Sequence, residues 1–120
     1  MASREDFESY LIRMNLEVEE VGESLWVVRP QNGETPVVVN YTPPVALLRL
    51  KVLDLPADAS DRELGPLYRR LLELNATDIV HGSYGIEAGD VVLSDAMELE
   101  TLDFSELRSS YESLTLAASS

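Results

Sequence analysis

Apolar and polar positions alternate along this chain with two periods, one helical and one typical of strands. Residues 4–15 carry apolar side chains at helical spacing, and Ser3 with Asp6 forms a capping-box pattern that predicts where the helix begins. Short segments rich in β-preferring residues follow, and we predict strands at residues 16–21, 24–29, 37–41 and 48–53. Because their connections are short, the strands are expected to form an antiparallel meander.

A second helix is predicted after the longest loop. Ser60 and Glu63 form another capping box, and the following segment repeats leucines and a tyrosine on one helical face. Pro66 lies beyond the first turn of this helix, where its ring and its missing N–H are unfavourable. We therefore expect either a short irregular turn at residues 60–64 before the main helix, or a kinked helix.

A hairpin and a third helix complete the pattern. The hairpin runs from residues 82–87 through a glycine turn into residues 90–93, and Asp103 with Glu106 predicts the start of the last helix. The apolar positions of that helix form a narrow seam, namely Phe104, Leu107, Tyr111, Leu114 and Ala118. Such a seam suits pairing with another helix or another copy, and it suits docking onto the sheet equally well.

These elements follow the order α-β-β-β-β-α-β-β-α, which predicts an α+β fold with helices packed on one antiparallel sheet. A chain of 120 residues has the length of one domain, so we expect residues 1–120 to form a single core. The first residues are charged and lead straight into the amphipathic pattern, so no signal peptide is expected.

Charge is the strongest compositional feature. The formal net charge is −13, and residues 76–120 carry nine Asp or Glu against one Arg. Such a surface repels nucleic-acid phosphates and anionic lipid, so neither nucleic acid nor membrane is an expected partner. It suits solubility, or a basic or aggregation-prone protein partner. The chain has no cysteine, which excludes disulfides and thiolate metal sites and fits a cytoplasmic location.

The residues that could carry chemistry form no recognisable site. His81 is the one histidine, and it has no partner nucleophile at a known spacing. Carboxylates cluster at Glu19 with Glu20, at Asp58 with Asp61, and at Asp95 with Glu98 and Glu100, but 22 acidic residues produce such neighbours by chance. The glycines near Tyr84 match neither phosphate-binding motif. We expect no catalytic residue, no cofactor and no metal.

Four runs in the second half carry a family resemblance. They are Leu-Leu-Glu-Leu-Asn at 71–75, Gly-x-Tyr-Gly-Ile-Glu at 82–87, Asp-Val-Val-Leu at 90–93 and Leu-Asp-Phe-x-Glu-Leu at 102–107. In these runs the sequence resembles the YbjN-like family, which is similar in fold to the class I type III secretion chaperones of the CesT, or Tir-chaperone, type. The resemblance implies a homodimer with a surface that binds an extended segment of another protein, and it brings no catalytic residues.

The expected function is that of a non-enzymatic, chaperone-like or regulatory domain that docks a segment of a partner protein. The alternative is a regulatory module that binds a small ligand or a metal. The candidate partner-binding or dimer surface comprises Trp26, Val28, Leu47, Leu53, Leu67 and Leu71. The four strand residues among them should form an exposed apolar patch of more than roughly a few hundred Å², although a tryptophan at strand spacing in an apolar run is more often a core or half-buried residue.

Overall fold

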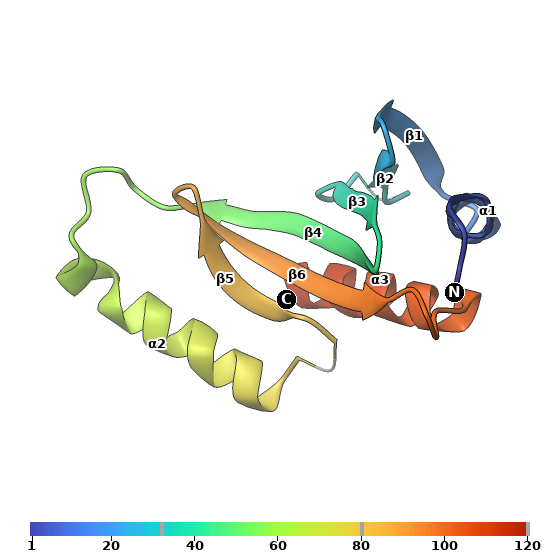
Figure 1. Ribbon diagram of the computed structural model, residues 1–120. Coiled ribbons are helices and arrows are strands. Elements are labelled where there is room, and N and C mark those ends of the chain that lie inside the picture. The colour runs from blue at the N-terminus through green and yellow to red at the C-terminus, as the bar shows by residue number, and fades with distance from the viewer. Residues whose placement is uncertain (32, 80, 120) are drawn as a thin grey trace.

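A computed structural model describes residues 1–31, 33–79 and 81–119 (Figure 1). Three helices and one antiparallel sheet follow the predicted order, so the α+β prediction is confirmed. The elements are α1 Arg4–Arg13, β1 Glu17–Gly22, β2 Leu25–Arg29, β3 Val37–Thr42, β4 Val45–Asp54, α2 Asp61–Thr77, β5 Ser83–Glu87, β6 Asp90–Glu98 and α3 Phe104–Ala118.

The six strands lie in the order β1-β2-β3-β4-β6-β5. The first four form the predicted meander, and β6 then pairs with β4, which leaves β5 at the far edge. The molecule is elongated, at 46 × 26 × 26 Å. Helix α1 and helix α2 consequently lie at opposite ends of the sheet, while α3 runs behind its middle (Figure 1).

The predicted capping boxes define the starts of α1 and α2. The Ser3 hydroxyl accepts from the Asp6 N–H at 3.0 Å, and the Asp6 carboxylate accepts from the Ser3 N–H at 3.2 Å. Ser60 and Glu63 repeat the arrangement. Helix α1 ends at Arg13, two residues before the predicted end, because Asn15 adopts a left-handed conformation with φ of 58°.

Helix α2 differs from one of the two forms expected for it. It begins at Asp61, directly after its cap, and continues to Thr77 with Pro66 inside it. The prediction of a separate irregular turn at residues 60–64 is therefore wrong. The capping box fixes the first turn as helix, and the helix continues through Pro66 although the proline has no N–H to donate.

The hydrophobic core lies on one face of the sheet, beneath α1 and α3. Helix α1 contributes Phe7 and Leu11, and β4 contributes Ala46, Leu48 and Leu50 at alternate positions. The seam of α3 docks onto the sheet: Leu107 and Leu114 are fully buried and Tyr111 is 6% exposed. Between the two interpretations of that seam, docking within the monomer is the one that the structure supports.

Candidate partner-binding surfaces

Helix α2 is the least buried of the three helices. Among its 17 residues only Leu71 is buried, while Leu72 is 69% exposed. The helix lies along β5, which is the element it contacts most (Figure 1). An amphipathic helix is stabilised mainly by burial of its apolar face, so a helix with this pattern needs a further contact.

The contact between α2 and β5 creates a shallow apolar depression of about 260 Å³. We call its lining residues the α2–β5 surface: Tyr68, Leu71, Leu72, Asn75, Tyr84, Gly85 and Ile86. Ile86 is 52% exposed, so two large apolar side chains, those of Leu72 and Ile86, flank the depression in contact with solvent.

A β-bulge brings Leu53 to the same side of the sheet as Ile86. The register of β4 against β6 shifts between Lys51 and Leu53, and Leu53 then pairs with Val91, which also pairs with Ile86. Paired residues of neighbouring strands point to the same face. Leu53, which is 39% exposed, therefore extends the α2–β5 surface across the end of the sheet.

The opposite face of the sheet is more polar. Leu47 is 37% exposed there and lines a groove of about 220 Å³ with Leu25, Val38 and Val92. The same groove contains an ion pair, in which Nη1 of Arg49 lies 2.7 Å from Oε1 of Glu87. Its apolar floor is therefore interrupted by charge, and the α2–β5 surface is the more continuous apolar surface.

The expectation of one exposed patch built from the strands is wrong for two of its residues. Trp26 is 1% exposed and Val28 is fully buried. Alternation along β2 turns both toward the helices, where Phe7 of α1 packs 5.7 Å from the Trp26 ring, between centroids. The outward positions of β2 are Leu25, Val27 and Arg29.

The other four candidates lie on both faces of the sheet. Leu47 lines the groove on the opposite face, whereas Leu53 extends the α2–β5 surface and Leu67 is half-buried on α2. Leu71 lines the α2–β5 surface. A dimer or partner role for these residues stays a prediction.

Leu72 and Ile86 were missed as site residues. Leu72 belongs to the apolar stripe of the helix, and its exposure depends on which part of the stripe meets the sheet. Ile86 is the one large aliphatic residue of β5, whose other members are Ser83, Tyr84, Gly85 and Glu87. A lone isoleucine in an otherwise polar strand was the available signal.

Two of the three acidic clusters contain carboxylates with structural partners. Glu19 pairs with Arg29 at 2.8 Å, Glu20 pairs with Arg4, and Asp95 accepts a 2.6 Å hydrogen bond from the Ser110 hydroxyl. These carboxylates hold strands and helices together, and their contacts account for their positions without any catalytic role.

The pKa values of one pair of carboxyl groups are shifted. Asp54 and Asp90 are paired residues of β4 and β6 at an exposed end of the sheet. The hydrogen bond from Lys51 lowers the pKa of Asp54, and the hydrogen bond with Asp54 raises the pKa of Asp90. Neither carboxyl lines the α2–β5 surface or the groove around Leu47.

Histidine and metal chemistry find no support in the described ranges. His81 is exposed, and its backbone N–H donates to the Ser113 hydroxyl at 3.3 Å. Across residues 1–31, 33–79 and 81–119, no group of three or more His, Asp or Glu could hold a metal ion. No helix in these ranges combines the length and apolar character needed to cross a membrane.

Several solved structures are similar in fold. A chain of the heterodimeric complex ExoU–SpcU from the type III secretion system of Pseudomonas aeruginosa superposes with a TM-score of 0.71 at 17% identity, covering 92% of this chain and 90% of that one. A chain of the Yersinia pestis type III secretion chaperone SycH in complex with a fragment of YscM2 gives 0.66 at 16%, covering 96% and 95%. The ExsC–ExsE complex gives 0.65 at 15%, covering 98% and 92%.

At these identities the likeness is one of fold, and it matches the element order derived above. No curated protein matches the sequence. A family model does match, over residues 2–120, which is nearly the whole chain. The chain therefore belongs to the CesT_Tir_1 family.

Proposed function

We propose that this protein is a chaperone-like, protein-binding domain that acts as a homodimer and docks a segment of a partner protein. Membership of the CesT_Tir_1 family supports the chaperone-like role. So does the fold, since its solved relatives include a type III secretion chaperone bound to a protein fragment. The observation that carries the proposal is the α2–β5 surface, an apolar surface that the monomer leaves exposed.

A second copy of the chain is the occupant that best fits the α2–β5 surface. Two molecules of net charge −13 repel each other at most of their surfaces. Helix α2 is an exception, because residues 61–77 contain three arginines and three acidic residues. The helix is electrically neutral and carries the exposed leucine, so two copies meeting there bury apolar area without bringing like charges together.

Binding without catalysis is part of the same proposal. The perturbed carboxyl pair, Asp54 with Asp90, lies in open solvent, and the family and fold are those of chaperones. We further propose that residues 1–120 form one domain. We also propose that the protein works in the cytoplasm, because a chain without cysteine needs no oxidising compartment to form disulfides. Kinship with the YbjN-like family, suggested by residues 71–107, stays a prediction.

Light scattering coupled to gel filtration tests the dimer. The wild-type chain at tens of micromolar should have twice the mass of the monomer. Leu72→Glu places a charge at the centre of the α2–β5 surface and should give a monomer. Ile12→Glu is the matched control, because Ile12 is 63% exposed on α1, at the other end of the sheet. A wild-type monomer, or dimerisation of Leu72→Glu equal to that of the control, would contradict this interface.

Affinity capture from the native lysate tests the partner. The wild-type chain should retain one protein in stoichiometric amount, which is then purified and recombined with the chain to form a complex of defined mass. A chain that captures no protein beyond the background of an unrelated acidic protein would count against the proposed function.

A further inference from the structure

A cleft of about 450 Å³ lies between the C-terminal half of α2 and the end of α3. Its lining comes from within residues 70–79, from Tyr84 of β5 and from within residues 113–117, and we call it the α2–α3 cleft. Helix α2 packs mainly on β5, whereas α3 packs mainly on β6 and β4, so the space between the two helices is left open. Its volume falls within the range of small-molecule sites, about 300–1,000 Å³.

Most of the lining of the cleft is apolar and only partly covered. Leu74, Ile79, Tyr84 and Ala117 are half-buried, and Leu116 is exposed. Burial raises the pKa of the Tyr84 phenol above its ordinary value, which indicates that the surroundings of this side chain have low polarity. Half-covered apolar side chains around an open cleft favour a ligand with an apolar body.

The cleft carries one positive and one negative charge, at opposite ends. Arg70, Leu74 and Asp78 follow at i, i+4 and i+8, so they form one row along α2. Eight residues of helix separate the two charged residues by about 12 Å. The Asp78 carboxylate accepts from the Thr77 hydroxyl at 2.8 Å and helps to raise the pKa of Tyr84. Arg70, in contrast, makes no hydrogen bond or ion pair with any described residue.

These charges decide the kind of ligand and its direction. A carboxylate at the Arg70 end gains a guanidinium partner, whereas a carboxylate at the other end is repelled by Asp78. The Ser113 hydroxyl is already engaged, since it accepts from the His81 N–H at 3.3 Å. An α-amino acid cannot reach both charges, because its ammonium and its carboxylate are attached to the same carbon atom. One carboxylate with an apolar chain fits the row best.

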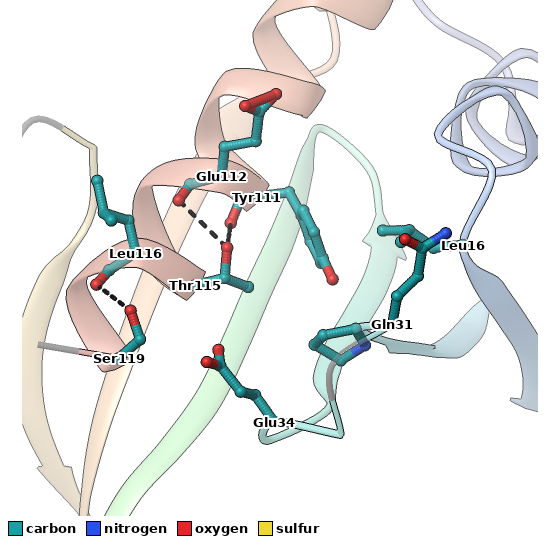
Figure 2. Close-up of a pocket in the computed structure, with 9 residues that line it drawn as sticks. Leu16, Gln31, Glu34, Tyr111, Glu112, Thr115, Leu116 and Ser119 are labelled. Atoms are coloured by element: carbon teal, nitrogen blue, oxygen red, sulfur yellow. Dashed lines mark hydrogen bonds between the residues drawn. The ribbon is translucent and has the colours of Figure 1, made fainter.

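The other side of α3 lacks this combination. A cleft of about 540 Å³ opens there beside Tyr111, whose hydroxyl is buried without a hydrogen-bond partner (Figure 2). The described part of its lining includes Glu34 and Glu112 but no Lys or Arg. A carboxylate is therefore repelled on this side of α3, which makes the Tyr111 side an internal comparison for the α2–α3 cleft.

We propose that the α2–α3 cleft binds a small carboxylic acid with an unbranched apolar chain, whose carboxylate meets Arg70 and whose chain lies along Leu74 toward Ile79. This site is additional to the proposed protein-binding function. It lies on one flank of α2, whereas Tyr68 and Leu72 on another flank line the α2–β5 surface. Because the ligand touches α2 and α3 together, it ties α2 to the core of the fold.

The probe is octanoate, which has one carboxylate and is shorter than the distance from Arg70 to Asp78. Titration into the ¹⁵N-labelled chain should shift the amide signals of Leu74, Ser113 and Ala117. Affinity should rise about tenfold from hexanoate to octanoate, because the longer acid buries two more methylene groups. Octanoate should also raise the melting temperature, since it binds only the folded chain.

The variant Arg70→Gln isolates the contact with the carboxylate. Arg70 is exposed, so the variant should fold, and it should bind octanoate about fivefold more weakly. Its affinity for octanol, which has the chain without the charge, should equal that of wild type. Arg69→Gln is the matched control, because it makes the same change of charge at the neighbouring exposed residue, outside the described lining of the cleft. It should bind octanoate as wild type does.

Four results would overturn the inference: no binding of octanoate at millimolar concentration, equal affinities for hexanoate and octanoate, equal losses in Arg70→Gln and Arg69→Gln, or shifts centred on Glu34 and Glu112. None of them bears on the dimer, because light scattering of wild type and Leu72→Glu is measured without octanoate. Failure of this site and failure of the proposed function are therefore distinguishable.

Discussion

The side-chain amide of Asn75 makes two hydrogen bonds to the backbone of Tyr84. Its Nδ2 donates to the Tyr84 carbonyl at 3.2 Å, and its Oδ1 accepts from the Tyr84 N–H at 2.7 Å. Asn75 belongs to α2 and Tyr84 to β5, the edge strand. The amide thus takes the place of a neighbouring strand, which fixes α2 to the sheet and covers a stretch of edge that could otherwise pair with another chain.

Substitution of Asn75 should release this attachment. Asn75→Ala removes both hydrogen bonds and should lower the free energy of unfolding by about 2 kcal/mol, since two half-buried backbone groups lose their partner. Asn75→Asp keeps the acceptor for the Tyr84 N–H and should cost less. Urea unfolding followed by circular dichroism measures both. Equal stability of Asn75→Ala and wild type would show that α2 is held by its apolar contacts alone.

Gly82 is the glycine whose replacement should be most costly. Its φ is +84°, and an added Cβ would lie 2.6 Å from the Ser94 carbonyl oxygen and 2.8 Å from Cδ2 of Leu114. Both neighbours are fixed, one as backbone and one in the core, so Gly82→Ala should lower the free energy of unfolding by about 2–4 kcal/mol.

Gly85 is the matched control for Gly82. It lies in β5, and an added Cβ would meet nothing within 4 Å. Gly85→Ala should change the free energy of unfolding by no more than about 0.5 kcal/mol. Thermal unfolding of the two variants side by side measures the difference, and similar melting temperatures would contradict the close approach at Gly82.

The features that were predicted correctly depend on residues close together in the sequence. Capping boxes at Ser3 and Ser60 involve residues three apart, so the pattern and the hydrogen bonds coincide. The meander follows from short connections. Strand β6 is longer than predicted, reaching Glu98 instead of residue 93, because its second half pairs with β4 although Ser94, Asp95 and Ala96 have little β preference.

The candidate site depended on contacts between residues distant in the chain, and these were harder to predict. Four of the five residues of β2, Leu25, Trp26, Val27 and Val28, are apolar, so alternation alone did not say which pair faces the core. The α2–β5 surface arises because β6 inserts beside β4 and leaves β5 for α2. The unsatisfied hydroxyl of Tyr111 cannot be predicted from sequence, because a tyrosine in an apolar seam has the same pattern whether or not its hydroxyl is paired.

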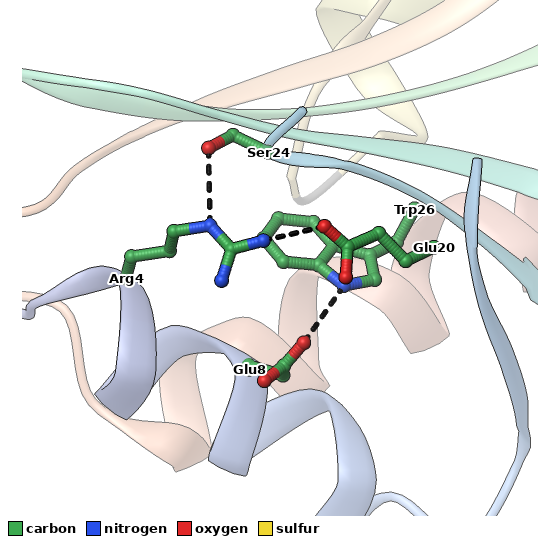
Figure 3. A network of polar contacts seen from close by, with 5 residues as sticks. All are labelled: Arg4, Glu8, Glu20, Ser24 and Trp26. Carbon is green, nitrogen blue, oxygen red and sulfur yellow. Dashed lines mark hydrogen bonds and ion pairs between the residues drawn. The ribbon is translucent and has the colours of Figure 1, made fainter. Parts of the chain in front are cut away.

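Arg4 joins α1 to the first two strands (Figure 3). Its guanidinium lies 5.1 Å from the centroid of the Trp26 ring, pairs with Glu20, and donates through Nε to the Ser24 hydroxyl at 3.2 Å. Arg4→Ala should lower the free energy of unfolding by about 1–1.5 kcal/mol, because the cation–π contact and the packing on the ring are lost along with the ion pair.

Arg29 offers the comparison for Arg4. It forms an exposed ion pair with Glu19 at 2.8 Å, on the neighbouring strand. Arg29→Ala should cost about 0.5 kcal/mol or less, the usual value of an exposed pair. Chemical unfolding in low and in high salt checks both, since salt should erase the Arg29 effect and leave most of the Arg4 effect. Equal losses in the two variants would argue that Trp26 adds nothing.

Tyr111 should also make the stability of the protein depend on alkaline pH. Burial raises the pKa of the Tyr111 phenol above its ordinary value, and the nearby Glu34 carboxylate adds to the shift. The folded state therefore holds this proton more tightly than the unfolded state. That contribution to stability is fully present below the pKa of the unfolded tyrosine, about 10, and is lost as the pH rises through the higher pKa of the folded state.

Tyr111→Phe removes this titration along with the unpaired hydroxyl. At about pH 7 the variant should already be more stable than wild type by roughly 1 kcal/mol, because it buries no unsatisfied donor. Between about pH 9 and pH 11 its advantage should widen, since only the wild type must bury a phenolate or release its ring. Glu34→Gln removes the second cause of the raised Tyr111 pKa. It should therefore reduce the loss of stability that the protein shows at alkaline pH. Urea unfolding across this range measures all three proteins, and a constant difference between wild type and Tyr111→Phe would mean that the hydroxyl reaches solvent in solution.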